Sequence, residues 1–103
     1  MDSARIVING VVVEEELQFT LLELSRACGA DSAQLVSMVA EGVLTPQGDS
    51  EGNWQFEGSA LQRARSALRL SSDLELTLAN TAFVLELLDE IHSLRIQLRR
   101  LGG

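Results

Sequence analysis

The sequence predicts a mainly α-helical fold with a short β wing, an amino-terminal strand and one long carboxy-terminal helix. Capping signals and glycines mark two short helices between residues 20 and 42, with a tight turn between them. Apolar residues at heptad spacing mark the long helix, from about residue 77 to residue 101. We therefore expect a winged helix-turn-helix-like domain over residues 1–76 and the long helix over residues 77–103.

The first residues are expected to be extended. Residues 4–13, ARIVINGVVV, are rich in β-branched side chains, which favour strands. The dipeptide Asn9-Gly10 in this segment is typical of a hairpin turn. The acids Glu14, Glu15 and Glu16 follow, and such a charged run discourages further strand pairing.

The first short helix has clear start and stop signals. Thr20 and Glu23 have the spacing of a capping box, in which each side chain satisfies a backbone N–H near the other. This predicts a helix over about residues 21–27, which Cys28-Gly29 ends.

The second short helix follows after a few residues. Asp31 or Ser32 can cap its start, and Gly42 stops it. Two short helices joined by a tight glycine-containing turn have the proportions of a helix-turn-helix. The apolar residues of the second helix share one face at helical spacing: Leu35, Met38 and Val39.

A wing and a third helix are expected next. Residues 47–56, QGDSEGNWQF, predict a wing hairpin in which Trp54 and Phe56 share a face by period-two alternation. Ser59 opens the third helix, and the SSD triplet at residues 71–73 is expected to interrupt it. Its inward-facing positions are Leu61, Ala64 and Leu68.

The long helix has two apolar faces. One is a heptad seam that starts at Asn80 and is apolar at every later position, and it predicts a homodimer. The other covers the first half of the helix and suits packing against the winged domain. The dimerisation residues of the seam are Val84, Leu87, Ile91, Leu94, Leu98 and Leu101, and the second stripe holds Leu78, Ala82, Leu85 and Leu88.

The charge of the chain disfavours nucleic acid as a partner. Fifteen acids oppose eight bases, all of them arginine, for a net charge of −7, which favours a basic partner. The second short helix, where a helix-turn-helix would read DNA, contains no Lys or Arg, so direct DNA binding is not expected. No apolar run is long enough to span a membrane, and a single cysteine fits a reducing compartment, so we expect a cytoplasmic protein.

No catalytic, metal or cofactor motif stands out. Cys28 has no CxxC partner, and a Cys-His pair with the single histidine, His92, would need an orienting group and a pocket. The glycines at 48 and 52 lack the Lys-Ser/Thr of a phosphate-binding loop. We therefore expect a protein that is not an enzyme and uses no cofactor.

The order of elements resembles the MerR-like helix-turn-helix modules, and more closely the CbpM chaperone-modulatory family. The likeness covers roughly residues 14–101, most of the chain. It rests on the order and spacing of short motifs rather than on any one of them: Phe19-Thr20, Gly29, Glu41-Gly-Val-Leu-Thr-Pro46, Trp54, Phe56, Leu68-Arg-Leu70 and Leu87-Leu-Asp-Glu-Ile91.

The resemblance implies a function as a chaperone modulator. Members of the family look like former DNA-binding modules that bind the J domain of CbpA, a DnaJ-type co-chaperone, and restrain its activity. The protein would then compete with docking of the J domain to an Hsp70-class chaperone, and it would also reduce the DNA association of CbpA. As the family resemblance implies, a J domain docks through a basic helix beside a His-Pro-Asp loop, so an inhibitor should present carboxylates backed by apolar area.

Two candidate patches meet this requirement. One is Glu14, Glu15 and Glu16; the other, which we favour, lies on the long helix, although its leucines can instead pack against the winged domain. Two rival functions stay open: a MerR-type transcriptional regulator that uses the wing and the arginines of the third helix on DNA, and a structural dimerisation protein with no dedicated ligand. The residues of the favoured patch are Leu85, Glu86, Leu88, Asp89 and Glu90.

Overall fold

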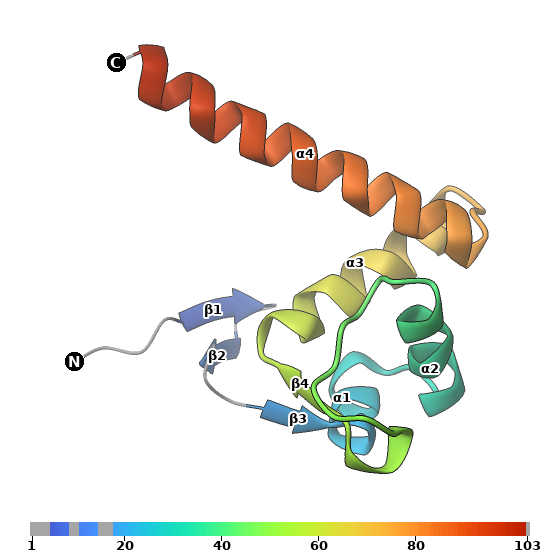
Figure 1. Ribbon diagram of the computed structural model, residues 1–103. Helices are drawn as coiled ribbons and strands as arrows, with labels where there is room; N and C mark the ends of the chain where they lie inside the picture. The colour runs from blue at the N-terminus through green and yellow to red at the C-terminus, as the bar shows by residue number, and fades with distance from the viewer. Residues whose placement is uncertain (1–4, 9–10, 15–17, 103) are drawn as a thin grey trace.

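A computed structural model describes residues 5–8, 11–14 and 18–102, and the side chains of residues 18–102. It confirms the predicted fold class: a small helical domain with short strands carries one long helix at its carboxyl end (Figure 1). The long helix crosses one side of the domain and continues beyond it (Figure 1). In the described part of the chain, none of the helices is both long enough and apolar enough to cross a membrane.

The expected amino-terminal strands are present. β1 (Arg5–Ile8) and β2 (Val11–Glu14) pair in an antiparallel sheet, with Ile8 opposite Val11. This register leaves two residues for the connection, as a tight hairpin requires. The dipeptide Asn9-Gly10 itself lies outside the described residues.

Both predicted ends of the first helix, α1 (Leu21–Cys28), are confirmed. The Thr20 hydroxyl accepts a hydrogen bond from the Glu23 N–H at 3.1 Å, and the Glu23 carboxylate accepts one from the Thr20 N–H at 2.9 Å. This reciprocal pair is the capping box that the spacing predicted. Gly29 ends the helix in the left-handed conformation, with φ 70°.

The second helix, α2 (Ser32–Ala40), packs against α1 through the predicted apolar face. Asp31 is its N-cap, and the Gln34 side chain accepts a hydrogen bond from the Asp31 N–H at 3.0 Å. Leu35 and Met38 are fully buried. Gly42, with φ 81°, then turns the chain so that the Val43 N–H donates to the Met38 carbonyl at 2.8 Å.

The wing differs from the expected hairpin. β4 (Gln55–Glu57) pairs along its length with β3 (Gln18–Thr20), a three-residue strand too short for the sequence pattern to predict. The wing loop is closed by one bridge between Gln47 and Gln55, with a 3₁₀ turn, η1 (Glu51–Asn53), inside it. β3 ends directly before α1, so its pairing with β4 holds the wing beside the start of α1.

Phe56 of β4 lies at the centre of the domain. Its ring is fully buried, and the half-buried ring of Trp54 meets it edge-on, with centroids 6.1 Å apart and planes at 85°. The two rings therefore meet as period-two alternation predicted.

The third helix, α3 (Ser59–Asp73), corrects two expectations. Gly58 is its N-cap and makes no side-chain cap bond, so Ser59 is the first helical residue and not the cap. The SSD triplet does not interrupt the helix, because the break comes after it, where Glu75 adopts φ 52°. Serines near a helix end can bond to the backbone instead of breaking the helix, and the Ser71 hydroxyl donates to the Leu76 carbonyl at 2.9 Å.

The long helix, α4 (Leu78–Gly102), begins where the sequence predicted. The Thr77 hydroxyl accepts a hydrogen bond from the Asn80 N–H at 3.1 Å and so caps its start. Only its first turns pack into the core, through Thr81, Ala82 and Leu85. At 1.5 Å per residue its 25 residues span about 37 Å, so most of its length lies outside the core.

We expect Gly42→Ala to destabilise the fold by about 1 kcal/mol, because a side chain disfavours the left-handed conformation that Gly42 adopts. An added Cβ would meet no atom within 4 Å at Gly42 or at Gly52, and Gly52 has no positive φ. Gly52→Ala is therefore the matched control, and we expect it to be neutral or slightly stabilising. Urea unfolding followed by Trp54 fluorescence measures both, and equal midpoints would contradict the backbone argument.

Candidate functional site

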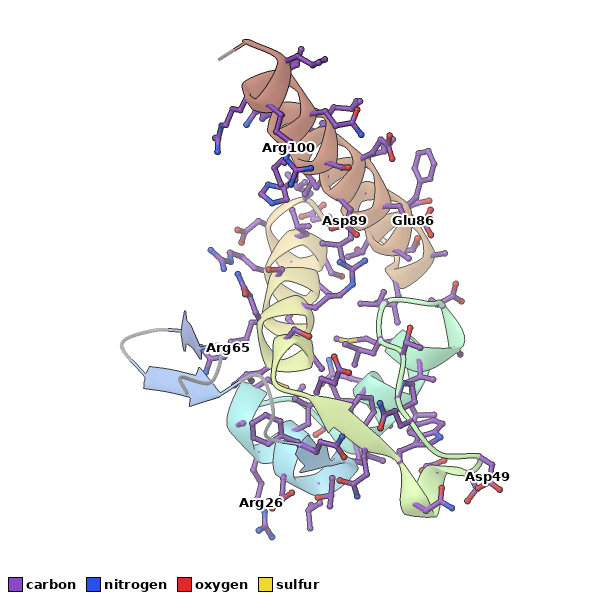
Figure 2. All side chains as sticks on the ribbon, turned by 60° about the vertical axis from the view of Figure 1, so that its left-hand side comes forward. Arg26, Asp49, Arg65, Glu86, Asp89 and Arg100 are labelled. Carbon is purple, nitrogen blue, oxygen red and sulfur yellow. The ribbon has the colours of Figure 1, made fainter. Side chains whose placement is uncertain are left out.

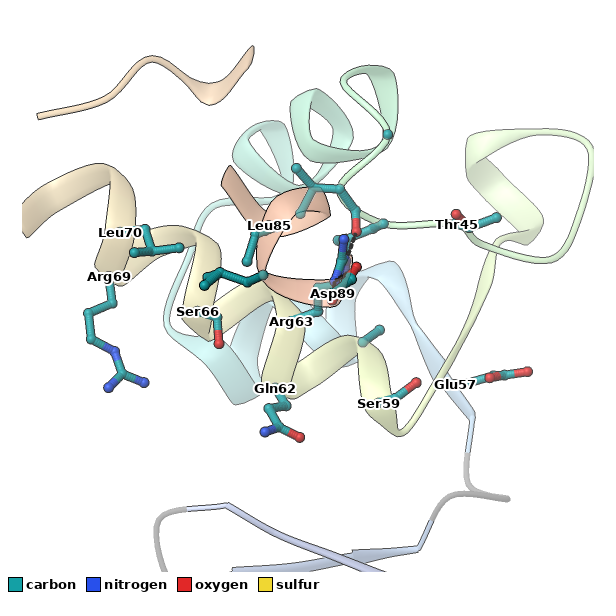
Figure 3. A pocket seen from close by; sticks show the side chains of 15 residues that line it. Thr45, Glu57, Ser59, Gln62, Arg63, Ser66, Arg69, Leu70, Leu85 and Asp89 are labelled. Atoms are coloured by element: carbon teal, nitrogen blue, oxygen red, sulfur yellow. Dashed lines mark hydrogen bonds and ion pairs between the residues drawn. The ribbon is translucent and has the colours of Figure 1, made fainter. Parts of the chain in front are cut away.

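A groove of about 900 Å³ lies between α3, α4 and the loop that leaves α2 (Figure 3). Its α4 wall is formed by Leu85, Leu88 and Asp89, and its loop wall by residues 42–45. The α3 wall is polar along its outer edge, with Gln62, Ser66 and Arg69 among the lining residues. The groove therefore combines an apolar floor with a polar rim, which is the composition of many binding surfaces.

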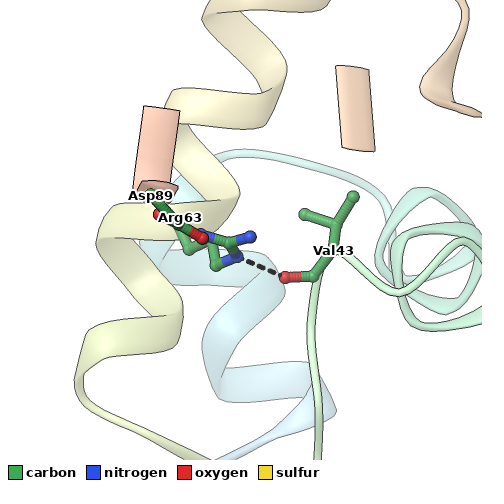
Figure 4. Close-up of polar contacts among 3 residues, drawn as sticks. All are labelled: Val43, Arg63 and Asp89. Carbon is green, nitrogen blue, oxygen red and sulfur yellow. Dashed lines mark hydrogen bonds and ion pairs between the residues drawn. The ribbon is translucent and has the colours of Figure 1, made fainter. Parts of the chain in front are cut away.

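Arg63 joins the three walls of this groove (Figure 4). Its Nε donates to the Val43 carbonyl at 2.7 Å, and its Nη1 lies 3.1 Å from Asp89 Oδ2. One α3 side chain thus ties α4 to the segment that follows the second helix. The planar guanidinium suits this role because its donors point in fixed directions.

The structure separates the predicted partner-binding residues of α4. Leu85 is only 5% exposed and belongs to the core, so its side chain offers no free surface. Leu88 and Asp89 line the groove, and Figure 2 shows Asp89 on the side of α4 that faces α3 and Glu86 on another side. Successive residues of a helix are about 100° apart, so residues four positions apart differ by only about 40°. Glu90 therefore lies on the same side of α4 as Glu86.

The surface around Glu86 and Glu90 contains an apolar residue that the sequence reasoning missed. Phe83 is 61% exposed and lies one turn before Glu86 on the same face. We call Phe83, Glu86 and Glu90 the acidic flank. The i, i+3, i+7 spacing of these residues is the sequence signal for this surface, and Phe83 falls outside the heptad seam.

The other acidic candidates are only partly described. Glu14 is the last residue of β2 and pairs across the sheet with Arg5. Glu15 and Glu16 lie outside the described residues.

Most seam residues of α4 are exposed apolar side chains. Leu87 is 49% exposed, and exposure reaches 85% at Leu101 near the end. From the helical repeat, the seam points about 160° away from the side that carries Leu85. The seam is therefore uncovered in the single chain and faces away from the winged domain; its exposed members are Leu87, Ile91, Leu94, Leu98 and Leu101, with Val84 half-buried.

Two α3 arginines bond to the backbone of the protein itself. Arg63 binds the Val43 carbonyl, and Arg65 Nη2 donates to the Ala27 carbonyl at 3.1 Å. Residues 18–57, which include both short helices and the wing, hold six acids against Arg26 alone, a net of −5. Both observations disfavour phosphate contact by this domain.

Cys28 and His92 are placed as ordinary side chains. Burial raises the pKa of the Cys28 thiol above its usual range, so the reactive thiolate is disfavoured. His92 is exposed on α4. Within residues 5–8, 11–14 and 18–102, no three His, Cys, Asp or Glu side chains gather in a way that could hold a metal ion.

Comparison with known proteins agrees with this architecture. Residues 19–102 match the MerR HTH family regulatory protein model. The chain is 33% identical over 95 residues to the chaperone modulatory protein CbpM of Coxiella burnetii strain Dugway 5J108-111, covering 92% of this chain and 90% of that protein. The chain belongs to the CbpM family.

A CbpM from another organism agrees with this assignment. The CbpM of Salmonella arizonae is 36% identical over 83 residues, which cover 81% of this chain and 82% of the relative. The resemblance seen in the sequence is thereby confirmed. The matched relatives are named chaperone modulatory proteins, and the MerR-type match agrees with the helix-turn-helix of α1 and α2.

We expect Arg63→Met to destabilise this CbpM-family fold by about 1–2 kcal/mol, since it leaves the buried Val43 carbonyl without its donor. Asp89→Asn should cost less than about 1 kcal/mol, because the Asp89 side chain is 63% exposed and the ion pair is screened by water. Chemical denaturation of both variants and of the double mutant gives the coupling. If Asp89→Asn costs as much as Arg63→Met, the carbonyl bond is not the main contribution.

Proposed function

We propose that this protein is a cytoplasmic chaperone modulator that binds the J domain of a CbpA/DnaJ-type co-chaperone and inhibits it. The observation that carries the proposal is the match over nine-tenths of the chain to proteins named for chaperone modulation. Inhibition follows if the bound protein occupies the surface through which the J domain docks to its Hsp70-class chaperone. Reduced DNA association of the co-chaperone would follow from the same complex.

The acidic flank of α4 is the surface that we propose for the J domain. Glu86 and Glu90 are exposed, and no ion pair involves them among the described residues. Phe83 supplies apolar contact area beside them. Such rim charges mainly set the association rate of a basic partner, while a desolvated aromatic anchor slows dissociation.

Asp89 has a different part in this proposal. Its carboxylate is held by Arg63 in the groove, so it is less available to a partner than Glu86 or Glu90. Leu88 is 47% exposed at the groove and can extend the contact on that side. Of the acids in the favoured patch, Glu86 and Glu90 are therefore the ones that we propose for the main contact with the J domain.

A homodimer through the seam of α4 completes the proposal. A stripe of leucines and isoleucine that its own domain leaves uncovered gains free energy when a second copy buries it, at roughly 25 cal/mol per Å². The repeat of the stripe is that of a coiled coil, which favours a second copy over an unrelated cover. The acidic flank would lie at the edge of this pairing.

A transcriptional regulator is the alternative, and the charge of the winged domain disfavours it. A net of −5 over residues 18–57 would repel a DNA duplex, and affinity for DNA depends mainly on Lys and Arg contacts to phosphate. The MerR-type match supports the shared fold and not DNA binding as such.

Reversal of the acidic flank tests the J-domain proposal. We expect Glu86→Lys with Glu90→Lys to slow association with a purified CbpA J domain by about tenfold and to flatten its salt dependence, because both attractive charges become repulsive. Stopped-flow or biosensor kinetics across a salt series measures this. Reversal of Glu14, Glu15 and Glu16 should have a smaller effect.

Glu41→Lys with Asp73→Lys is the matched control, since it makes the same change in net charge at exposed sites outside the flank, at the ends of α2 and α3. Equal slowing in the control would show that only net charge matters. Unchanged binding in every variant would contradict the charge mechanism.

Substitutions in the seam test the dimer. We expect Leu87→Asp with Leu94→Asp to give a monomer in analytical ultracentrifugation, because each substitution replaces an exposed apolar side chain with a charge inside the proposed interface. His92→Asp with Ser93→Asp adds two acids on the same helix outside the seam and should leave the dimer intact. A dimer that survives in the first variant would reject the seam.

A further inference from the structure

A second hollow, of about 400 Å³, lies between the first turn of α1, the start of α2 and the wing. Its apolar lining includes Leu21, Leu22 and Trp54. The Leu22 side chain is 54% exposed, so the domain leaves part of this apolar surface uncovered. No residue of α4 lines it, so it is separate from the surfaces discussed above. We call it the wing pocket.

Among the described residues, the only charged side chain that lines the wing pocket is acidic. It is Glu51 of η1, and Asp49 lies on the same wing. A hydrogen bond from the Asn53 side chain lowers the pKa of Asp49 below its usual range. Arg26, the one base of residues 18–57, lies one turn after Leu22 on α1 but does not line the pocket.

An arginine or lysine side chain fits this combination. Its aliphatic stem can cover an exposed apolar residue such as Leu22 while its charged head stays near a carboxylate. A guanidinium also stacks favourably on an indole such as that of Trp54. An anionic ligand such as a DNA phosphate would meet the carboxylate of Glu51 and no base in the pocket.

We propose that the wing pocket binds an arginine or lysine side chain from a basic segment of a protein partner. The face that reads DNA in a helix-turn-helix thus contacts a polypeptide of opposite charge here. This inference does not depend on the α4 flank or on the identity of the partner that the flank binds.

Trp54 gives a direct test, because it is the only tryptophan and the chain has no tyrosine. The probe is an acetylated and amidated five-residue peptide with two arginines on either side of one leucine, titrated against the full chain. We expect a saturable shift of Trp54 emission, weakened by added salt, and no shift with the peptide that has glutamates in place of arginines. An equal shift with a leucine-only peptide would show that the pocket binds apolar side chains without a basic group, and it would overturn the proposal.

Two matched variants locate the site. Glu51→Gln should weaken peptide binding by about threefold or more, whereas Glu41→Gln, the same charge change at the far end of α2, should not. Leu22→Ala should also weaken it, since its exposed side chain supports the stem of the arginine. Equal effects of Glu51→Gln and Glu41→Gln, or a Trp54 shift that depends on protein concentration without peptide, would contradict the proposal.

Discussion

The two apolar faces of α4 are the constraint on which the rest of this structure depends. A domain of this size can cover only one of them, and it covers the side that carries Ala82 and Leu85. This packing fixes where α4 leaves the domain and leaves the seam pointing the other way. The uncovered seam is the basis for the proposed dimer, and the acidic flank beside it is the basis for the proposed contact with a J domain.

Arg63 gives a fixed direction to the packing of α4 against the winged domain. The apolar contacts of Leu85 alone would hold α4 against α3 without fixing its angle, because hydrophobic burial is non-directional. The bond from Arg63 to the Val43 carbonyl and the ion pair with Asp89 link that angle to the loop that follows α2. Arg63 thus serves to position the protein's own helices.

Much of the fold could be predicted because local chemistry determined it. The capping box of Thr20 and Glu23 and the glycine that ends α1 each depend on residues three or four positions apart. β3 could not be predicted, since its three residues are a strand only because β4 lies beside them. The end of α3 was misplaced because Ser71 found a backbone acceptor across the turn that follows.

The candidate site was less predictable than the fold. The sequence grouped Leu85, Leu88 and the neighbouring acids by their proximity along the chain. Tertiary packing then buried Leu85 and directed Asp89 to Arg63, which is 26 positions earlier in the sequence. The exposure of Phe83 and Leu22 depends on which neighbours the fold leaves out. Helical spacing places Phe83 beside Glu86 and Glu90, but it does not report whether these side chains are covered.

The central claim is that this protein restrains a J-domain co-chaperone by occupying its docking surface. The most direct measurement is the ATPase rate of an Hsp70-class chaperone stimulated by a CbpA-type protein, with this protein added in increasing amounts. The account predicts that stimulation falls toward the unstimulated rate, and that the variant with Glu86→Lys and Glu90→Lys needs a higher concentration for the same effect. Full stimulation at a large excess of the wild-type protein would contradict it.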